Sequence, residues 1–371
     1  MQSSLFEENR CFRLFWTVVI SILGGTIFVF IHLPIPWLLG PMTAVFIASR
    51  VGRIKPYWPV ELRNVGLVIV GYTIGLSFTK DALVKIIHQL PSMLLMTVML
   101  ILFNALFAMI IAKFTGVDYP TVLTGCIPGG LSQIITLGEE IKGIDLTIVT
   151  LLQVTRLMMI IFIVPFLVMS PLVSGGDSFD FTSKSGNIGS NWGELFPNIL
   201  LFAIISVLFA YLGKKVKLPT PYLLGPVIAT VLLNLNGFHG ASLPPFITDI
   251  SQFLMGAYIG LLMKPDQLKN KLKIISYSIF SGLILILGSL GLTLLLVKFH
   301  HFSPATGFLS AAPGGMDQMG IIAHEVHADL SIVTGYQLFR IFFIYFIVPP
   351  FLKWFFAFHE RRKLKSSEIK S

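Results

Sequence analysis

Apolar residues occur in long runs from one end of the chain to the other, and short polar segments separate these runs. A helix needs about 20 predominantly apolar residues to cross the hydrocarbon core of a bilayer. Each half of the sequence holds six runs near this length, so the pattern predicts an all-α integral membrane protein. The runs cover about 13–31, 36–50, 62–79, 91–113, 120–141 and 145–169 in the first half, and about 195–213, 221–236, 247–263, 274–298, 304–325 and 329–352 in the second.

The composition supports a membrane protein. Hydrophobic residues make up 54% of the chain and charged residues 12%, about half the charged share of soluble proteins. In a soluble protein the net charge of +9 would suggest nucleic acid. Here the basic residues lie in short loops beside apolar runs, where they orient a membrane protein. We therefore expect the lipid bilayer, and no nucleic acid, as a partner.

The second half of the chain repeats the first. The sequence Pro-Trp-Leu-Leu-Gly-Pro at 36–41 recurs as Pro-Tyr-Leu-Leu-Gly-Pro at 221–226. Aligned pairs continue over roughly 135 residues, which indicates a duplication. A Gly-x-x-x-Gly pattern, which lets two membrane helices pack closely, occurs in both copies: Gly71 and Gly75 in the first, and Gly256 and Gly260 in the second.

A helix breaker interrupts the fifth run of each half, where Pro-Gly-Gly at 128–130 recurs at 313–315 with the same spacing between the copies. Proline and glycine are the least favourable residues inside a helix. A break frees backbone N–H and C=O groups, and in membranes such breaks survive where they face a cavity, an ion or a substrate. The alternative is a simple tight turn. The residues of the two breaks and the polar residues aligned after them are Pro128, Gly129, Gly130, Gln133 and Glu140, and Pro313, Gly314, Gly315, Gln318 and Glu325.

The loop charges predict that the two halves have opposite orientations. Arg50, Arg53 and Lys55 follow the second run of the first half, whereas the matching cluster at 214–217 precedes the second run of the second half. Under the positive-inside rule this shift inverts the repeat. Inversion requires an odd number of crossings, so we expect five transmembrane helices and one broken or re-entrant hairpin per half, with both termini cytoplasmic. The alternative is twelve crossings in parallel repeats.

These patterns divide the chain into four parts. We expect a first membrane repeat at 1–170 and a second at 195–355. Between them, 171–194 is rich in Ser, Gly and Asn and is predicted to be a polar linker outside the cell. The segment 356–371 is a basic tail, predicted to be cytoplasmic.

The two breaks differ in one charge. Ser132 beside Gln133 in the first copy is replaced by Asp317 beside Gln318 in the second. A carboxylate in this position could bind a proton or a sodium ion, with hydroxyl, amide and backbone oxygens completing the shell. Alternatively, Asp317 caps the helix that follows the break.

One arginine lies deep in the last run of each half. Arg156 and Arg340 are each eleven residues beyond an aspartate, Asp145 and Asp329. This places the arginines about 16 Å along their helices, near the bilayer centre. Such a charge must be paired or face water. Two roles stay open: the arginines bind an anionic group of a substrate, or they bridge to Glu140 and Glu325. A glutamine three residues earlier shares the helix face of each arginine: Gln153 and Gln337.

The sequence contains no pattern that we assign to catalysis, to a cofactor or to a resident metal. His324-Glu325-x-His327 lacks the spacing that places two histidine ligands on one helix face. The two cysteines, Cys11 and Cys126, are too few for a disulfide framework or a thiolate metal site. We therefore expect a protein that is not an enzyme.

The duplicated Pro-Trp/Tyr-Leu-Leu-Gly-Pro and Pro-Gly-Gly motifs closely resemble the AbrB family of bacterial membrane proteins, over nearly the whole chain. The resemblance implies a bacterial inner-membrane protein. Members of that family carry labels such as ammonia monooxygenase and membrane regulator, and they differ from the soluble DNA-binding regulators of the same name. Oxygen chemistry at copper or iron needs a set of His or carboxylate ligands, which the repeated pattern lacks.

The leading hypothesis is a secondary transporter or exporter of a small solute. An anionic solute is one candidate, and protons or sodium are the candidate coupling ions. The transport hypothesis rests on the repeats, the paired breaks and the buried ionisable residues. The competing hypothesis is a membrane-embedded sensor that regulates gene expression. A homo-oligomer is compatible with either.

Overall fold

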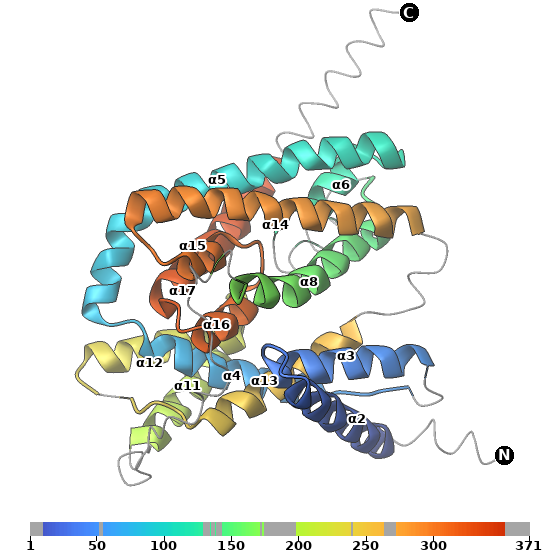
Figure 1. The fold of residues 1–371 in the computed structure, drawn as a ribbon. Coiled ribbons are helices and arrows are strands. Elements are labelled where there is room, and N and C mark those ends of the chain that lie inside the picture. Colours follow the sequence, from blue (N-terminus) through green and yellow to red (C-terminus); the bar gives the residue numbers. More distant parts are fainter. Residues whose placement is uncertain are drawn as a thin grey trace, which may run out of the picture.

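The computed structural model describes residues 10–51, 55–128, 134, 138, 143–170, 173, 198–238, 240–262 and 272–352. Within these residues all regular structure is helical (Figure 1). The helices of the first half are α2 (Arg10–Phe30), α3 (Pro36–Val51), α4 (Val60–Leu76), α5 (Lys80–Thr115), α6 (Tyr119–Cys126) and α8 (Leu146–Val168). Those of the second half are α11 (Asn198–Lys215), α12 (Pro221–Leu235), α13 (Pro245–Leu262), α14 (Leu272–His300), α15 (Pro304–Ala311), α16 (Met316–Glu325) and α17 (Leu330–Phe346).

Helix α5 starts eleven residues before the predicted run at 91–113. The hydroxyl of Thr79 caps its N-terminus by accepting from the Ala82 N–H at 3.2 Å. Pro91, which the sequence places at the start of the run, therefore lies inside the helix. Proline removes one helical hydrogen bond and bends a helix, and α5 changes direction along its length in Figure 1.

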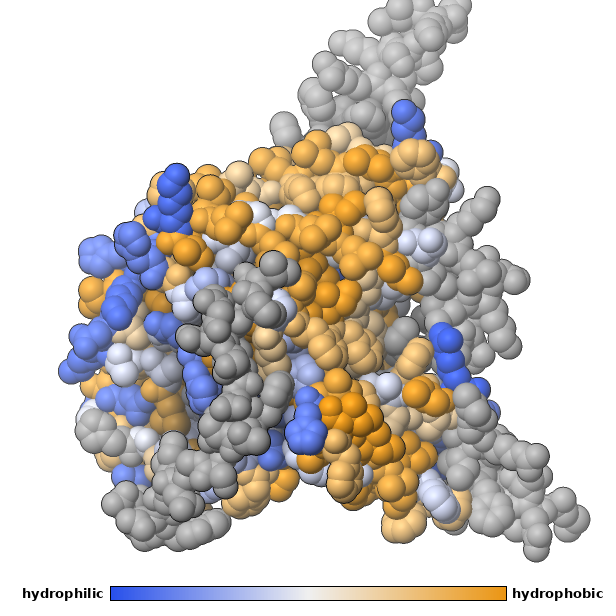
Figure 2. Space-filling model, in the orientation of Figure 1, coloured by the Kyte–Doolittle hydropathy of each residue, from blue (hydrophilic) through white to orange (hydrophobic). Residues whose placement is uncertain are grey.

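Six helices in the described part of the chain are long and apolar enough to cross a membrane: α2, α5, α8, α11, α13 and residues 279–300 of α14. Large apolar side chains point outward along them, including Ile87 and Leu102 on α5 and Leu287 and Leu294 on α14. Figure 2 shows hydrophobic residues over much of the upper part of the molecule, where α5 and α14 lie. Exposed apolar surface is typical of a face that contacts lipid, so the six apolar helices indicate a membrane protein.

Equivalent positions of the two halves adopt the same unusual backbone conformation. His32 and Lys217, which align in the repeat, have φ of 56° and 59°, and the aligned pair Ile35 and Thr220 both have φ of 47°. Positive φ is uncommon for residues other than glycine. The two halves therefore share local turns as well as sequence.

Each half contributes helices to a bundle that the two Gly-x-x-x-Gly patterns hold together. Helices α2, α3, α4, α11, α12 and α13 form it, in the lower part of Figure 1; we call it the glycine bundle. A Cβ atom on Gly71 of α4 would stand 2.5 Å from the Leu223 carbonyl oxygen of α12. A Cβ atom on Gly260 of α13 would stand 2.5 Å from the Met42 carbonyl oxygen of α3. Glycine thus allows each of these helices to pack directly on the backbone of the other half, as predicted.

The remaining helices form a second group, the break bundle, which contains α5, α6, α8, α14, α15, α16 and α17. Helices α5 and α14 cover it in the upper part of Figure 1, and α16 lies next to α4 of the glycine bundle. One buried apolar cluster joins the two groups, with Leu39 and Ile74 on one side and Phe308 and Met319 on the other. The break bundle carries the polar residues that the sequence singled out.

Candidate functional site

The fifth run of the second half is not one helix. Helix α15 ends at Ala311 and α16 begins at Met316. Between them the backbone is extended, with ψ of 133° at Ala312 and 151° at Gly315. Ala312 and Pro313 are buried, so the freed backbone groups need partners within the protein.

In the first half, the described residues show the same helix ending before the Pro-Gly-Gly sequence. Helix α6 ends at Cys126, and Ile127 is extended with ψ of 127°. Pro128 follows and is buried. Other predicted site residues of this half lie outside the described residues: Gly129, Gly130, Ser132, Gln133 and Glu140.

Arg340 and Gln337 of α17 bind the carbonyl groups at the break of the second half. The Gln337 Nε2 group donates to the Leu309 and Ala312 oxygens at 2.8 and 3.2 Å. The Arg340 guanidinium donates to the Ala312 and Gly314 oxygens at 2.8 and 2.7 Å. It also donates to Gln337 Oε1. We call this arrangement the carbonyl clamp.

The first half has its own carbonyl clamp, made by Arg156 and Gln153 of α8. Gln153 Nε2 donates to the Ile127 oxygen at 2.8 Å and to the Thr124 oxygen at 3.4 Å. Arg156 donates to the Cys126 oxygen at 2.6 Å and to Gln153 Oε1 at 2.6 Å. The glutamines bind equivalent carbonyls in the two halves, whereas the second arginine reaches further along the chain, to Gly314.

The clamp explains how these charges are tolerated in the interior. Arg156 is 7% exposed and Arg340 4% exposed. The C-terminal end of a helix carries a partial negative charge and free carbonyl oxygens, which a cation stabilises. The arginines therefore bind backbone carbonyl oxygens, a partner that neither hypothesis from the sequence included. Glu325 instead accepts from Gln252 Nε2 at 2.9 Å, and Glu140 lies outside the described residues.

A second pair of matching contacts fixes the starts of α8 and α17, the helices that carry the clamp residues. Thr121 Oγ1 accepts from the Asp145 N–H at 3.2 Å, and Thr306 Oγ1 accepts from the Asp329 N–H at 3.0 Å. Each aspartate also caps its helix, since the carboxylate of Asp145 accepts from the Ile148 N–H and that of Asp329 from the Ile332 N–H. The start of α8 is thus tied to α6, and the start of α17 to α15.

Asp317 and Gln318 lie in the first turn of α16, directly after the break. The Gln318 Nε2 group donates to Asp317 Oδ2 at 2.9 Å. Asp317 is half-buried, and its carboxylate also interacts with the positive charge of Arg63 on α4. Gly315, the residue at the N-cap of α16, has no side chain to bond to the helix.

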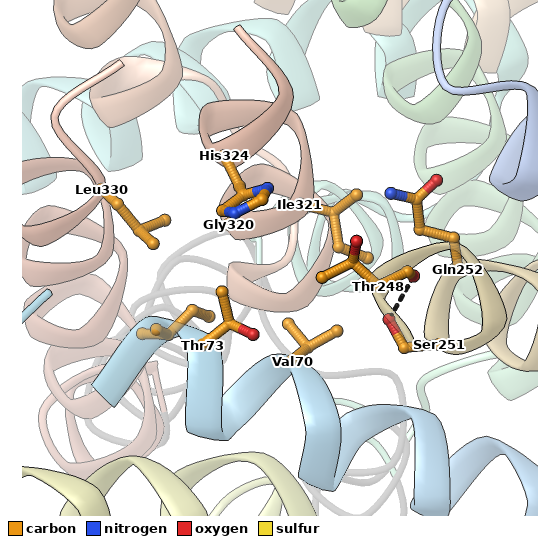
Figure 3. A pocket seen from close by; sticks show the side chains of 10 residues that line it. Val70, Thr73, Thr248, Ser251, Gln252, Gly320, Ile321, His324 and Leu330 are labelled. Atoms are coloured by element: carbon orange, nitrogen blue, oxygen red, sulfur yellow. Dashed lines mark hydrogen bonds between the residues drawn. The ribbon is translucent and has the colours of Figure 1, made fainter. Parts of the chain in front are cut away.

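A small cavity, partly open to the surface, lies where α16 faces the glycine bundle. Figure 3 shows side chains of three helices directed toward it, with Thr73 on α4, Ser251 on α13 and His324 on α16. The cavity thus opens between the two helices that carry Gly-x-x-x-Gly and the helix that follows the break. Its lining is Val70, Thr73, Ile74, Thr248, Ser251, Gln252, Gly320, Ile321, His324 and Leu330.

The sequence prediction did not include this cavity. Apart from His324, its polar residues come from runs whose only predicted role was packing. Gln252 is the one amide among the residues of α13. An isolated amide in a membrane helix is a usable signal, since polar groups there face the protein interior. Gln252 is 2% exposed and points its amide at Glu325.

The family model described as "Transition state regulatory protein AbrB" matches residues 37–356. The chain belongs to the AbrB family. A similar protein of this length is "Uncharacterized protein YhjN" of Bacillus subtilis (strain 168), which is 25% identical over 98% of both chains. Another is "Putative regulator AbrB" of Escherichia coli (strain K12), 25% identical over 93% of this chain and 97% of the relative.

The part of the chain that matches the AbrB family includes both carbonyl clamps, the cavity and the second break. Within the described residues of this AbrB-family protein, no three His, Cys, Asp or Glu side chains are placed to hold a metal ion. The polar groups that the structure gathers are instead hydrogen-bonding residues around interrupted helices.

Proposed function

We propose that this AbrB-family protein is a secondary transporter or exporter of a small solute in the bacterial inner membrane. The observation that carries the proposal is the buried interruption between α15 and α16, next to a cavity on the face of α16. Interrupted helices near the centre of a membrane protein provide binding sites in transporters.

The proposal includes an inverted repeat of five transmembrane helices and one broken hairpin per half. Two observations support it: the halves share turn conformations at aligned positions of the repeat, and the basic loop clusters are displaced by one crossing. Inverted repeats place two breaks opposite each other and permit alternating access by rocking.

Labelling of single cysteines tests the inversion. In a full-length background with Cys11→Ser and Cys126→Ser, Lys184→Cys and Lys215→Cys are treated in intact cells with a membrane-impermeant maleimide. We expect position 184 to react and position 215 to react only after the cells are opened. Reaction of both positions from the same side contradicts the inverted arrangement.

The cavity lining indicates a small solute with both polar and apolar parts. Hydroxyl, amide and imidazole groups line it beside Val70 and Ile321. Because the clamp arginines already bind carbonyl groups, the polar cavity residues are the more accessible recognition groups. An anionic solute would meet His324, the one basic side chain of the lining.

Transport assays test the solute site. Metabolite profiling of a deletion strain identifies candidates, which are then offered to purified protein in vesicles. We expect Thr73→Val with Gln252→Leu to reduce transport at least about tenfold, since each lost hydrogen bond costs about 1 kcal/mol. Thr43→Val is the matched control, because Thr43 and Thr73 both donate to a carbonyl of their own helix and only Thr73 lines the cavity. Equal transport by all three proteins contradicts the site.

A second candidate function is regulation of gene expression from the membrane, which the name of the Escherichia coli relative suggests. The two functions separate in a deletion strain that carries the Thr73→Val, Gln252→Leu variant. If transcription returns to normal while transport does not, the protein regulates independently of transport. If neither returns, the transcriptional effect follows from the solute.

A further inference from the structure

Among the described residues, none donates to the buried side-chain oxygen of Gln318. The side chain is 5% exposed, and among the described residues its Oε1 atom has no hydrogen-bond partner. The bond from Nε2 to Asp317 Oδ2 fixes the orientation of the amide, since only the nitrogen can donate to a carboxylate. A buried acceptor without a partner costs free energy, so its retention beside the break requires a reason.

The free oxygen of Gln318 and a carboxylate oxygen of Asp317 converge at the break. A Cβ atom built on Gly315 would lie 2.5 Å from Asp317 Oδ1 and even closer to Gln318 Oε1. The two oxygens are thus at most about 5 Å apart, the largest separation of two ligands that bind one ion at about 2.3–2.6 Å. Glycine at 315 keeps the space beside them open.

The charges at this place favour a monovalent cation. Asp317 supplies one carboxylate and Gln318 a neutral oxygen, while Arg63 adds a positive charge near the same carboxylate. Divalent cations bind sites with more carboxylates. In transporters, unwound backbone carbonyls and the C-terminal ends of half-helices coordinate sodium ions, and carboxylates inside the membrane mark ion pathways. We propose that Asp317 and Gln318 bind a sodium ion at the break between α15 and α16.

The ion would lie on the same face of α16 as the solute cavity. Asp317, Ile321 and His324 follow the spacing of one helix face, and the last two line the cavity. One helical turn, about 5 Å, separates Asp317 from Ile321. This inference rests on the proposed transport function, because a bound ion at this distance would set the position of α16 when the solute binds.

Thermal unfolding of the purified full-length protein tests the site. Unfolding is followed in sodium chloride, potassium chloride and choline chloride at equal ionic strength. A ligand that binds only the folded protein raises the Tm in proportion to its saturation. We expect a saturable rise in sodium alone, and loss of that rise in Asp317→Asn and Gln318→Leu.

Gln89→Leu is the matched control. Gln89 is also a buried glutamine whose Oε1 has no partner among the described residues, but it lies on α5, whereas Gln318 lies on α16. The sodium response should persist in this variant. If Gln318→Leu does not fold, Gln318→Glu replaces it as the test variant. This substitution keeps a side-chain oxygen and adds a negative charge, so the variant should gain a Tm rise in calcium chloride. Equal behaviour of the wild type in the three salts overturns the site, as does an unchanged sodium response in both Asp317→Asn and Gln318→Leu.

Vesicle transport separates this inference from the function on which it rests. If solute transport does not depend on a sodium gradient and sodium does not raise the Tm, the ion site is contradicted and the transport function is still supported. Stabilisation by sodium without movement of any solute contradicts the transporter and leaves the ion site standing.

Discussion

Gln153 and Gln337 make the same contact in the two halves of the protein. Each amide nitrogen donates to the carbonyl oxygen of the residue before the proline of Pro-Gly-Gly: Gln153 to Ile127 at 2.8 Å and Gln337 to Ala312 at 3.2 Å. Each amide oxygen accepts from an arginine three residues later. Helix α8 thereby holds α6, and α17 holds α15, so these buried polar residues serve first to stabilise interrupted backbone.

Replacing Arg340 should destabilise the protein. Arg340→Met leaves the Ala312 and Gly314 oxygens without their charged donor. Gln337 still donates to the Ala312 oxygen, so the Gly314 oxygen is the acceptor that loses its donor, at a cost of about 1–3 kcal/mol. The avoided burial of a charge partly offsets this cost, and we expect a net loss of about 1–2 kcal/mol. Unfolding of purified protein in detergent measures it. Arg50→Met, at an exposed arginine, is the control and should change stability by less than about 1 kcal/mol.

Arg340→Lys distinguishes the structural role from solute binding. Lysine keeps the charge but lacks the planar fork that reaches two carbonyls. A folded Lys variant that does not transport points to direct contact with the solute. Loss of folded protein in both the Lys and Met variants rules that contact out.

Gly71 should not tolerate even a methyl group. In Gly71→Ala the new Cβ would meet the Leu223 carbonyl oxygen, a backbone atom that cannot move aside easily. Overpacking of this kind costs about 1–3 kcal/mol. Gly291→Ala on α14 has no atom within 4 Å of the new Cβ, so it should gain up to about 1 kcal/mol from helix propensity. Equal Tm values for the two variants would refute close packing of α4 on α12.

His327→Gly should stabilise the turn before α17. His327 has φ of 52°, while its counterpart Gly143 in the first half has φ of 87°. The left-handed conformation costs a residue with a Cβ atom about 1–2 kcal/mol, part of which the greater freedom of unfolded glycine cancels. We expect a gain of about 0.5–1 kcal/mol. Gly143→Ala should lose a similar amount, because open space surrounds it and only the backbone is strained. A lower Tm for His327→Gly would contradict the strain.

Removing only the hydroxyl group of Thr306 should destabilise the protein. Thr306→Val preserves the shape of a side chain that is 2% exposed but removes the acceptor of the Asp329 N–H. A buried N–H without a partner costs about 1–3 kcal/mol. Thr26→Val is the control, since Thr26 bonds only to carbonyls of its own helix. If both variants unfold at the same temperature, the link between α15 and α17 contributes nothing.

Local patterns determined the helices almost completely. Runs of apolar residues, Pro-Gly-Gly and the aspartates at 145 and 329 act through the backbone preferences of nearby residues, so the ends of most helices fall within a few residues of the prediction. The start of α5 is the exception. Proline at 91 suggested a beginning, but the cap at Thr79 lets the helix start earlier and bend.

The sequence by itself determined the all-helical membrane architecture, the internal duplication and the residues on which the polar interior depends. The tertiary structure decided what those residues touch: Arg340 reaches carbonyls of the break, Glu325 meets Gln252 of α13, and a cavity opens between α4, α13 and α16. The physical reason is the distance along the chain over which each interaction acts. Hydrophobic burial and backbone preference act on neighbours along the chain, whereas a long polar side chain takes its partner from whichever distant helix the fold brings beside it.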